Sequence, residues 1–389
     1  MRIRVLGVYY NFIRPAVRSL YYFIADVFLK IFSFLFFWVR PKNINKDSVK
    51  KILVVKLERI GDLVLSLPAL REIRSYFPES KVYMITTSYT KDILETSPYI
   101  DELLVYDRNA SLKDKISFIK MLREYCFDLA IDLTTRNFMF LPVWILGFSK
   151  AKVTVGLNNY GRAFLYNIKV NPYPFIELYG KEVMHILEPL GIKSDDYKPK
   201  LFLSRSNEEF IHRFFKEKNI DEEAIKVVIH PGGYYEALRW EEKSYAKVTE
   251  HILANYKAVV FFVGSKKEFS LIERIVSCAG SSENIFNLAG ELSLGESMAL
   301  IAKANLFIGN SSGPLHIACG FDIPTVSFLG PSIPKRWWPQ GEKNIVFRGK
   351  LSNKDYDIEY SQNKDYRSLR KVTVEEVIRA VDSHLRIVK

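Results

Sequence analysis

The chain is poor in cysteine and in metal-binding and nucleotide-binding motifs. Its 389 residues include three cysteines, Cys126, Cys278 and Cys319, and no CxxC pair. This spacing favours a reducing compartment and unpaired, mostly buried thiols over a disulfide framework. The six histidines show no HExxH spacing, so no zinc site is expected. Neither a P-loop nor a GxGxxG motif is present, which argues against a standard NTPase or a dinucleotide-dependent dehydrogenase.

Low-complexity segments are also lacking. The chain is longer than one that usually folds around a single hydrophobic core. A hydrophobic content of 48% is enough to fill more than one core. Two domains are therefore the expectation. Residues 1–50 carry nine Lys and Arg against two Asp, which accounts for seven of the net charge of +12. The first eighth of the chain is thus a strongly basic leader.

Residues 17–39 of this leader form an apolar run long enough to span a bilayer as a helix. Asp26 and Lys30 lie near its middle, however, and each costs about 2.5–3.5 kcal/mol at a bilayer centre. At helical spacing the polar residues share one face, so the pattern favours an amphipathic helix in an anionic membrane surface through residues 14–42. Packing on the protein's own body is the second interpretation, and a true span the third. A signal peptide is disfavoured, and nucleic acid is not an expected partner.

From Lys51 onward, buried strands alternate with helices, which predicts parallel sheets with helices on both faces. Residues 191–206 are polar and indicate a domain boundary. Capping boxes at Ser206–Glu209 and Thr373–Glu376 predict helix starts. We therefore expect two doubly wound α/β domains facing a cleft at the carboxyl ends of their strands. The predicted division is a leader 1–50, domains 51–205 and 206–370, and a C-terminal helix 371–389.

Residues 309–313, Gly-Asn-Ser-Ser-Gly, follow a buried strand and precede Pro314, a favourable first residue of a helix. Backbone N–H groups at such a helix start can bind a phosphate or another anion. The alternative is an ordinary turn in which the Asn and Ser side chains cap the helix. These residues by themselves do not separate the two interpretations.

Four motifs, in this order, together resemble glycosyltransferase family 9, the heptosyltransferases of lipopolysaccharide core assembly. They are ILVVKLERIGDLVLSLPALREIRSYFP, IHPGGYYEALRW, FFVGSKKE and NLAGELSLGESMALIAKANLFIGNSSGPLHIACGFDIPTVSFLGP. The resemblance implies a GT-B architecture with an N-terminal acceptor domain and a C-terminal nucleotide-sugar domain. It also implies inverting, metal-independent transfer without a cofactor, usually of heptose from ADP-heptose, to a lipopolysaccharide-type or other lipid-linked glycan. The expected location is the cytoplasmic face of the inner membrane, as a peripheral protein.

Within this resemblance, Asp62 in the ERIGD turn matches the family's base, which removes a proton from the acceptor hydroxyl. The alternative is that Asp62 is only the N-cap of the following helix, and Glu58 is the second candidate base. The motifs also imply a donor site, in which glycines permit close approach to phosphate and Arg239 contacts the diphosphate. Its predicted residues are His230, Gly232, Gly233, Arg239, Gly264, Ser311, Ser312, Gly313 and His316. A purely structural role for His316 is nearly as well supported.

The chain departs from the family's pattern at two positions. Ser311 stands where many members have an acidic residue, and Leu238 where many have a lysine. Both positions are associated with donor recognition, so a shifted donor preference is one hypothesis. The alternative is a degenerate member that binds nucleotide sugar or glycolipid without turnover. The DxD-like pair Asp355 and Asp357 lies in a polar loop and is interpreted as solvated.

Overall fold

The computed structural model describes residues 43–135, 139–159, 162–174, 177–233, 239–330, 335–348 and 368–386. The predicted leader helix at 17–39, Leu238 and the pair Asp355 and Asp357 lie outside these residues. Within the part of the chain that the structure describes, no helix combines the length and apolar character needed to cross a membrane.

The N-terminal domain contains a parallel six-stranded sheet in the order β3-β2-β1-β4-β5-β6. Its central strands are runs of β-branched and aliphatic residues buried on both faces, as expected for a sheet covered by helices. The strands are β1 (Lys51–Val55), β2 (Lys81–Thr87), β3 (Glu102–Tyr106), β4 (Leu129–Asp132), β5 (Val153–Leu157) and β6 (Ile168–Val170).

Helices of this domain follow the strands. The predicted helix after β1 is interrupted ahead of Pro68, because that proline occupies the first turn of a new helix. The helices are α3 (Ile60–Val64), α4 (Leu67–Tyr76), α5 (Leu112–Glu124), α6 (Leu141–Ser149) and α7 (Tyr179–His185). Short 3-10 turns are η2 (Lys46–Ser48), η3 (Lys91–Ile93) and η5 (Glu188–Leu190).

The C-terminal domain repeats the same arrangement, with a parallel sheet in the order β12-β11-β10-β7-β8-β9. Its strands are β7 (Ile225–His230), β8 (Ala258–Phe262), β9 (Ile285–Asn287), β10 (Leu306–Asn310), β11 (Thr325–Leu329) and β12 (Asn344–Arg348). Its helices are α8 (Arg205–Glu217), α9 (Glu242–Asn255), α10 (Phe269–Ala279), α11 (Leu294–Ala302), α12 (Gly313–Gly320) and α14 (Val374–Leu385), with turns η7 (Lys266–Glu268) and η8 (Ser368–Lys371). Both sheets have the strand order of a dinucleotide-binding fold, so the predicted pair of doubly wound α/β domains is confirmed.

Two local predictions were wrong in detail. Helix α8 begins with Ser204 as N-cap, whose hydroxyl accepts from the Asn207 N–H at 3.2 Å, rather than at the predicted box beginning with Ser206. The three thiols are unpaired, but Cys126 and Cys278 are exposed and Cys319 alone among them is buried. The capping box at Thr373–Glu376 is confirmed and opens α14.

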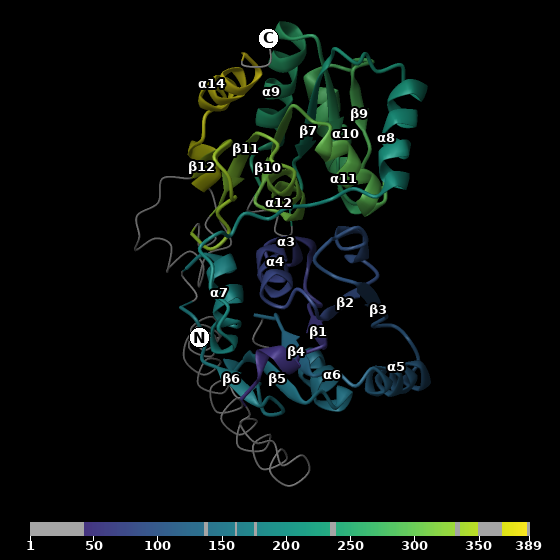
Figure 1. Ribbon diagram of the computed structural model, residues 1–389. Helices are drawn as coiled ribbons and strands as arrows, with labels where there is room; N and C mark the ends of the chain where they lie inside the picture. The colour runs from purple at the N-terminus through teal and green to yellow at the C-terminus, as the bar shows by residue number, and fades with distance from the viewer. Residues whose placement is uncertain are drawn as a thin grey trace, which may run out of the picture.

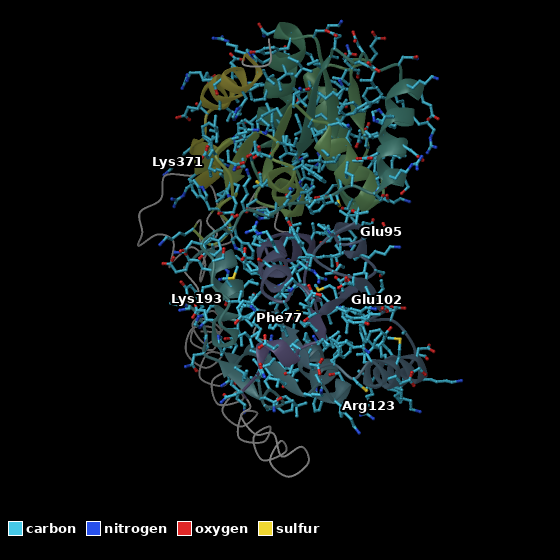
Figure 2. The ribbon with its side chains drawn as sticks, in the orientation of Figure 1. Phe77, Glu95, Glu102, Arg123, Lys193 and Lys371 are labelled. Atoms are coloured by element: carbon cyan, nitrogen blue, oxygen red, sulfur yellow. The ribbon has the colours of Figure 1, made fainter. Side chains whose placement is uncertain are left out.

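The two domains lie one above the other, and α3 of the first faces α12 of the second at their junction (Figure 1). Side chains fill both domains and the space where they meet (Figure 2). A continuous cluster of buried apolar residues joins them, from Leu63 and Leu67 on one side to Leu315 and Ile317 on the other. The carboxyl ends of β1 and β10 lead directly into α3 and α12, so this junction brings the ligand-binding edges of both sheets together.

Candidate active site between the two domains

The contact between α3 and α12 is made by glycines. A Cβ atom at Gly61 would lie 3.7 Å from the Cα of Gly313, and one at Gly313 would lie 2.8 Å from Cγ2 of Ile60. Larger residues would therefore separate the two helices. This packing places α3, in which Asp62 follows Gly61, against the start of α12 at Gly313.

Asp62 is 4% exposed and is the third residue of α3. Its Oδ2 accepts a hydrogen bond from the Arg59 backbone N–H at 3.3 Å, and Arg59 is the N-cap. The interpretation of Asp62 as the N-cap is therefore wrong, although its carboxylate does accept from an N–H at the start of the helix. A carboxylate in this position can serve as a proton acceptor at the domain junction.

Glu58 has a different environment, because it is bound to a buried lysine. Lys56 Nζ lies 2.5 Å from Glu58 Oε2, and neither side chain is accessible to solvent. The same ammonium donates to Leu133 O at 2.7 Å and to Tyr179 Oη at 2.8 Å, while the Tyr179 hydroxyl donates to Glu58 at 3.3 Å. Burial, together with the charges of Glu58 and Asp62, raises the pKa of Tyr179 well above its usual value, so the phenol stays protonated.

A second buried ion pair connects this network to the C-terminal domain. Arg336, which follows β11, is paired with Glu182 of α7. Its guanidinium also lies 5.0 Å from the centroid of the Tyr179 ring, and that ring stacks on Trp337 at 5.1 Å. Burial raises the pKa of Glu182, against the opposing effect of Arg336. Two buried cation–carboxylate pairs thus meet at Tyr179 and fix α7 against the loop after β11.

The predicted donor residues at the end of β7 surround a carboxylate that the sequence reasoning missed. Glu268 accepts from the Gly233 N–H at 3.1 Å, and a Cβ at Gly232 would lie 1.7 Å from its Oε1. A Cβ at Gly264 would lie 3.1 Å from Oε2. Gly232, Gly233 and Gly264 therefore leave room for Glu268, and the Gly233 N–H is already occupied.

Glu268 is held in its ionised form. Burial on its own raises the pKa of Glu268, but His230, whose Nε2 lies 3.7 Å from Oε1, and hydrogen bonds from the Ser265 N–H and hydroxyl lower it to about 2. The SKKE sequence at Ser265 has the spacing of a capping box, which could have identified Glu268 as a cap but not as a partner of His230.

His230 and Ser312 are brought together, with 3.0 Å between His230 Nδ1 and Ser312 Oγ. Asn310, also missed from the sequence, joins the two ends of the loop after β7. Its amide donates to Pro231 O at 2.7 Å and to Gly232 O at 3.0 Å, and its Oδ1 accepts from the Trp240 N–H at 3.0 Å. The end of β10 therefore fixes Pro231 and Gly232 relative to Trp240.

Arg239 donates to Gly233 O through Nε at 3.2 Å and through a terminal nitrogen at 2.7 Å. Arg239 is thus held against the backbone of Gly233. Trp240 is buried and stacks on Phe328 with centroids 4.3 Å apart, so it packs in the core.

The start of α12 has no side-chain cap, since the hydroxyl of its N-cap residue Ser312 donates to Asn310 O at 3.1 Å. Ser311 instead donates its N–H to Phe328 O at 3.0 Å. His316 is 2% exposed, and burial lowers its pKa to about 4. In the described structure its Nδ1 has no hydrogen-bond partner. These residues place an uncapped helix start and a neutral imidazole at the junction.

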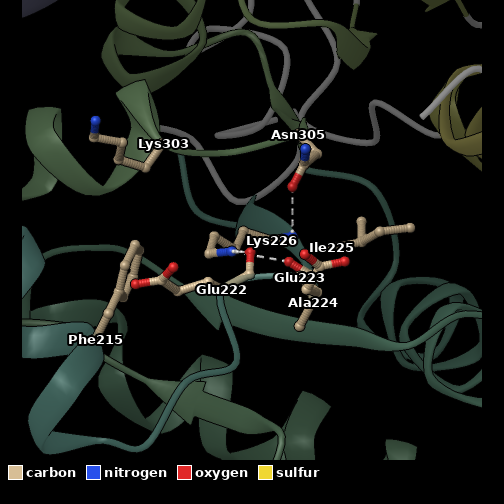
Figure 3. A pocket seen from close by; sticks show the side chains of 8 residues that line it. All are labelled: Phe215, Glu222, Glu223, Ala224, Ile225, Lys226, Lys303 and Asn305. Carbon is tan, nitrogen blue, oxygen red and sulfur yellow. Dashed lines mark hydrogen bonds between the residues drawn. The ribbon is translucent and has the colours of Figure 1, made fainter. Parts of the chain in front are cut away.

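Among the residues that the structure describes, no cluster of three or more His, Cys, Asp or Glu side chains could hold a metal ion. A cavity of about 210 Å³ lies elsewhere, lined by Phe215, residues 222–226, Lys303 and Asn305 (Figure 3). It lies at the amino ends of β7 and β10, and Lys226 there donates to Glu222 O and Ala224 O at 2.8 and 2.9 Å. Parallel α/β sheets bind ligands at the opposite edge, so this cavity is not the candidate site.

Known proteins resemble the chain in both sequence and fold. Residues 115–366 match glycosyltransferase family 9 (heptosyltransferase). The chain is 28% identical to lipopolysaccharide heptosyltransferase 3 of Escherichia coli K12 over 342 residues, which cover 84% of this chain and 95% of that protein.

Two solved structures share the architecture. One is a glycosyl transferase family 9 protein from Veillonella parvula, with a TM-score of 0.75 and 22% identity over 87% of this chain and 97% of that one. The other is E. coli ADP-heptose lps heptosyltransferase II, with a TM-score of 0.72 and 20% identity over 87% of this chain and 99% of that one. The predicted two-domain GT-B fold is thereby confirmed.

Proposed function

Since the chain belongs to glycosyltransferase family 9, we propose that this glycosyltransferase moves a heptose or related sugar from a nucleotide-diphosphate donor to a lipopolysaccharide-type or other lipid-linked glycan. The names of these relatives refer to heptosyltransferases and ADP-heptose, which makes ADP-heptose the first donor to test. The proposed transfer inverts the anomeric centre and uses no metal.

The observation that carries this proposal is the contact of α3 with α12. It brings the start of α3, which carries Asp62, against the start of α12, which follows Ser311 and Ser312, each at the carboxyl edge of its sheet. A transfer reaction needs the acceptor's base and the donor's leaving group on either side of one reacting carbon.

Asp62 is the proposed base. As it takes the proton from the acceptor hydroxyl, the hydroxyl oxygen bonds to the anomeric carbon and the bond from that carbon to the phosphate oxygen breaks. The nucleotide diphosphate leaves with the electron pair. Glu58 is less suited, because taking a proton would break its buried ion pair with Lys56.

The leaving diphosphate needs positive charge or N–H dipoles. The uncapped start of α12 at Ser312 and Gly313 and the guanidinium of Arg239 supply these in the proposed site. His230, Gly232, Gly233 and Gly264, with Glu268, shape the neighbouring donor surface. Ser311 and His316 complete the proposed donor contacts.

The lipid-linked acceptor places the proposed reaction at the cytoplasmic face of the inner membrane. The basic leader, through residues 14–42, is the proposed membrane contact of the N-terminus.

Replacement of Asp62 by Asn tests the proposed base. We expect turnover to fall by about 10²–10⁴, the usual contribution of a general base, with donor affinity unchanged in calorimetry. Glu58→Gln should instead mainly lower the free energy of unfolding, because it removes the carboxylate partner of the buried Lys56 ammonium. Near wild-type turnover of Asp62→Asn would remove Asp62 from the mechanism.

The donor is tested separately, with a calorimetric panel of ADP-, GDP- and UDP-sugars. Ser311 can donate one hydrogen bond but cannot accept from two sugar hydroxyls as a carboxylate can. This difference motivates the hypothesis of a donor preference shifted away from ADP-heptose. Tight and exclusive binding of ADP-heptose would refute the shift, and no binding of any nucleotide sugar would favour a degenerate member without turnover.

A further inference from the structure

Helix α5 lies at the outer edge of the N-terminal domain, beside α6 and away from the C-terminal domain (Figure 1). Of its thirteen residues, all of which the structure describes, Leu122 alone is buried. Phe118 turns inward and meets Tyr106 edge to face at 5.3 Å. One face of α5 therefore anchors the helix, and the remaining faces are open.

The open side of α5 carries large aliphatic residues. Leu112 is 75% exposed and Ile116 is 48% exposed. With the partly buried Ile119 they follow helical i, i+4, i+7 spacing, so they form one stripe. Single exposed aliphatic residues need no explanation, but neighbouring ones aligned on a helix indicate a contact surface.

Helix α6 extends this apolar surface. The Arg123 Nε at the end of the stripe donates to Phe148 O at 2.8 Å, which joins the two helices, and Arg123 is labelled at this edge in Figure 2. Trp144 and Phe148 of α6 are partly exposed and stack with centroids 5.5 Å apart. Tryptophan, with its amphipathic ring, is enriched at membrane–water interfaces.

Basic residues border the stripe. Lys113, Lys120 and Arg123 are exposed on α5, and Lys150 is exposed just beyond α6. The acidic residues of α5 are Asp114, whose carboxylate accepts from the Ser111 hydroxyl at 2.6 Å, and Glu124. Positive charge around an apolar stripe complements an anionic lipid surface, where each Lys or Arg contributes about 1 kcal/mol.

We propose that the surface formed by Leu112, Ile116, Trp144 and Phe148, with Lys113 and Lys120, docks the N-terminal domain on an anionic lipid bilayer. This contact is additional to the leader. It extends the proposed function, since a lipid-linked acceptor is presented at a membrane.

The test measures binding of the full-length chain to vesicles of phosphatidylethanolamine and phosphatidylglycerol. Every variant retains the leader, so its contribution cancels in the comparison. Leu112→Glu/Ile116→Glu should weaken vesicle binding about tenfold or more, because two aliphatic side chains lose their apolar contact. Lys113→Gln/Lys120→Gln should weaken it about fivefold per charge at low salt and less at high salt. The matched control is Phe269→Glu, an apolar residue 41% exposed on the other domain, which should bind as wild type.

Transfer of sugar to a water-soluble acceptor fragment should be unchanged in these variants, which separates this proposal from the proposed chemistry. If the double glutamate variant fails to fold, Lys113→Gln/Lys120→Gln still tests the proposal, because both lysines are exposed. Wild-type vesicle affinity in both double variants would overturn the proposal. The proposal would also be overturned if the wild-type chain were an oligomer and Leu112→Glu/Ile116→Glu a monomer that still binds vesicles. The surface would then bind a second copy of the chain.

Discussion

His316 lies directly against Gly61: a methyl group at Gly61 would be 3.1 Å from the imidazole Cδ2. The two residues belong to different domains, and Gly61 precedes Asp62. Because burial lowers the pKa of His316 to about 4, the imidazole is neutral at pH 7 and adds no charge beside the carboxylate. The contact between α3 and α12 thus combines two glycines with an uncharged ring.

Gly313→Ala should separate α3 from α12. Its new methyl would lie 2.8 Å from Cγ2 of Ile60, and overpacking of this kind costs about 1–3 kcal/mol. We expect turnover to fall while each domain keeps its secondary structure, as steady-state kinetics and circular dichroism would show. The double variant Gly313→Ala/Ile60→Ala removes the clashing methyl and should recover part of the turnover; equal loss in both variants would contradict the steric explanation.

Lys56→Met should destabilise the N-terminal domain by about 3–5 kcal/mol, because it leaves the Glu58 carboxylate buried without its ammonium partner. Urea unfolding followed by circular dichroism measures this. The matched variant Lys56→Met/Glu58→Leu removes both charges and should recover most of the loss. If Lys56→Met alone were as stable as wild type, the ion pair with Lys56 would not be the main interaction that stabilises the buried Glu58 carboxylate.

Glu268 should make the protein sensitive to acid. Its pKa is lowered to about 2 in the folded state from an ordinary value of 4.5, so the stability it contributes is present above about pH 4.5 and is lost as pH falls toward 2. The difference corresponds to an upper limit of roughly 3 kcal/mol, which solvent screening reduces because the carboxylate is only partly buried. In urea titrations at several pH values, Glu268→Gln should flatten this part of the pH dependence, whereas Glu291→Gln, at an exposed site, should not.

Arg239→Ala should weaken binding of nucleoside diphosphate about 10- to 100-fold, because a charge-assisted hydrogen bond contributes about 1.5–3 kcal/mol. The variant also removes the support of Gly233 O. Lys335→Ala removes an exposed positive charge paired with Glu177 and is the control, with affinity expected near wild type. Equal effects of the two variants in calorimetry would point to general electrostatics instead of a specific contact.

Much of the fold could be predicted from the sequence, because strand and helix patterns are local. The runs at Ile52–Val55 and Leu306–Asn310 are buried strands as predicted, and Ser311 and Ser312 connect the second run to a helix that begins at Gly313. The start of α8 was misplaced by a competing Ser two residues earlier, since Ser204 and Ser206 offer similar capping chemistry.

The candidate site was predicted only in its motifs. The sequence by itself determined that Asp62 and the residues at 230–233 and 309–313 lie at or just after the ends of buried strands, because period and turn chemistry act over a few residues. Only the tertiary structure decided that Glu268 fills the space left by Gly232 and Gly264, that Lys56 holds Glu58, and that Gly61 meets His316. Most of these contacts join residues far apart in the sequence. Which residues meet is set by spatial proximity, burial and charge, and no local sequence pattern encodes these.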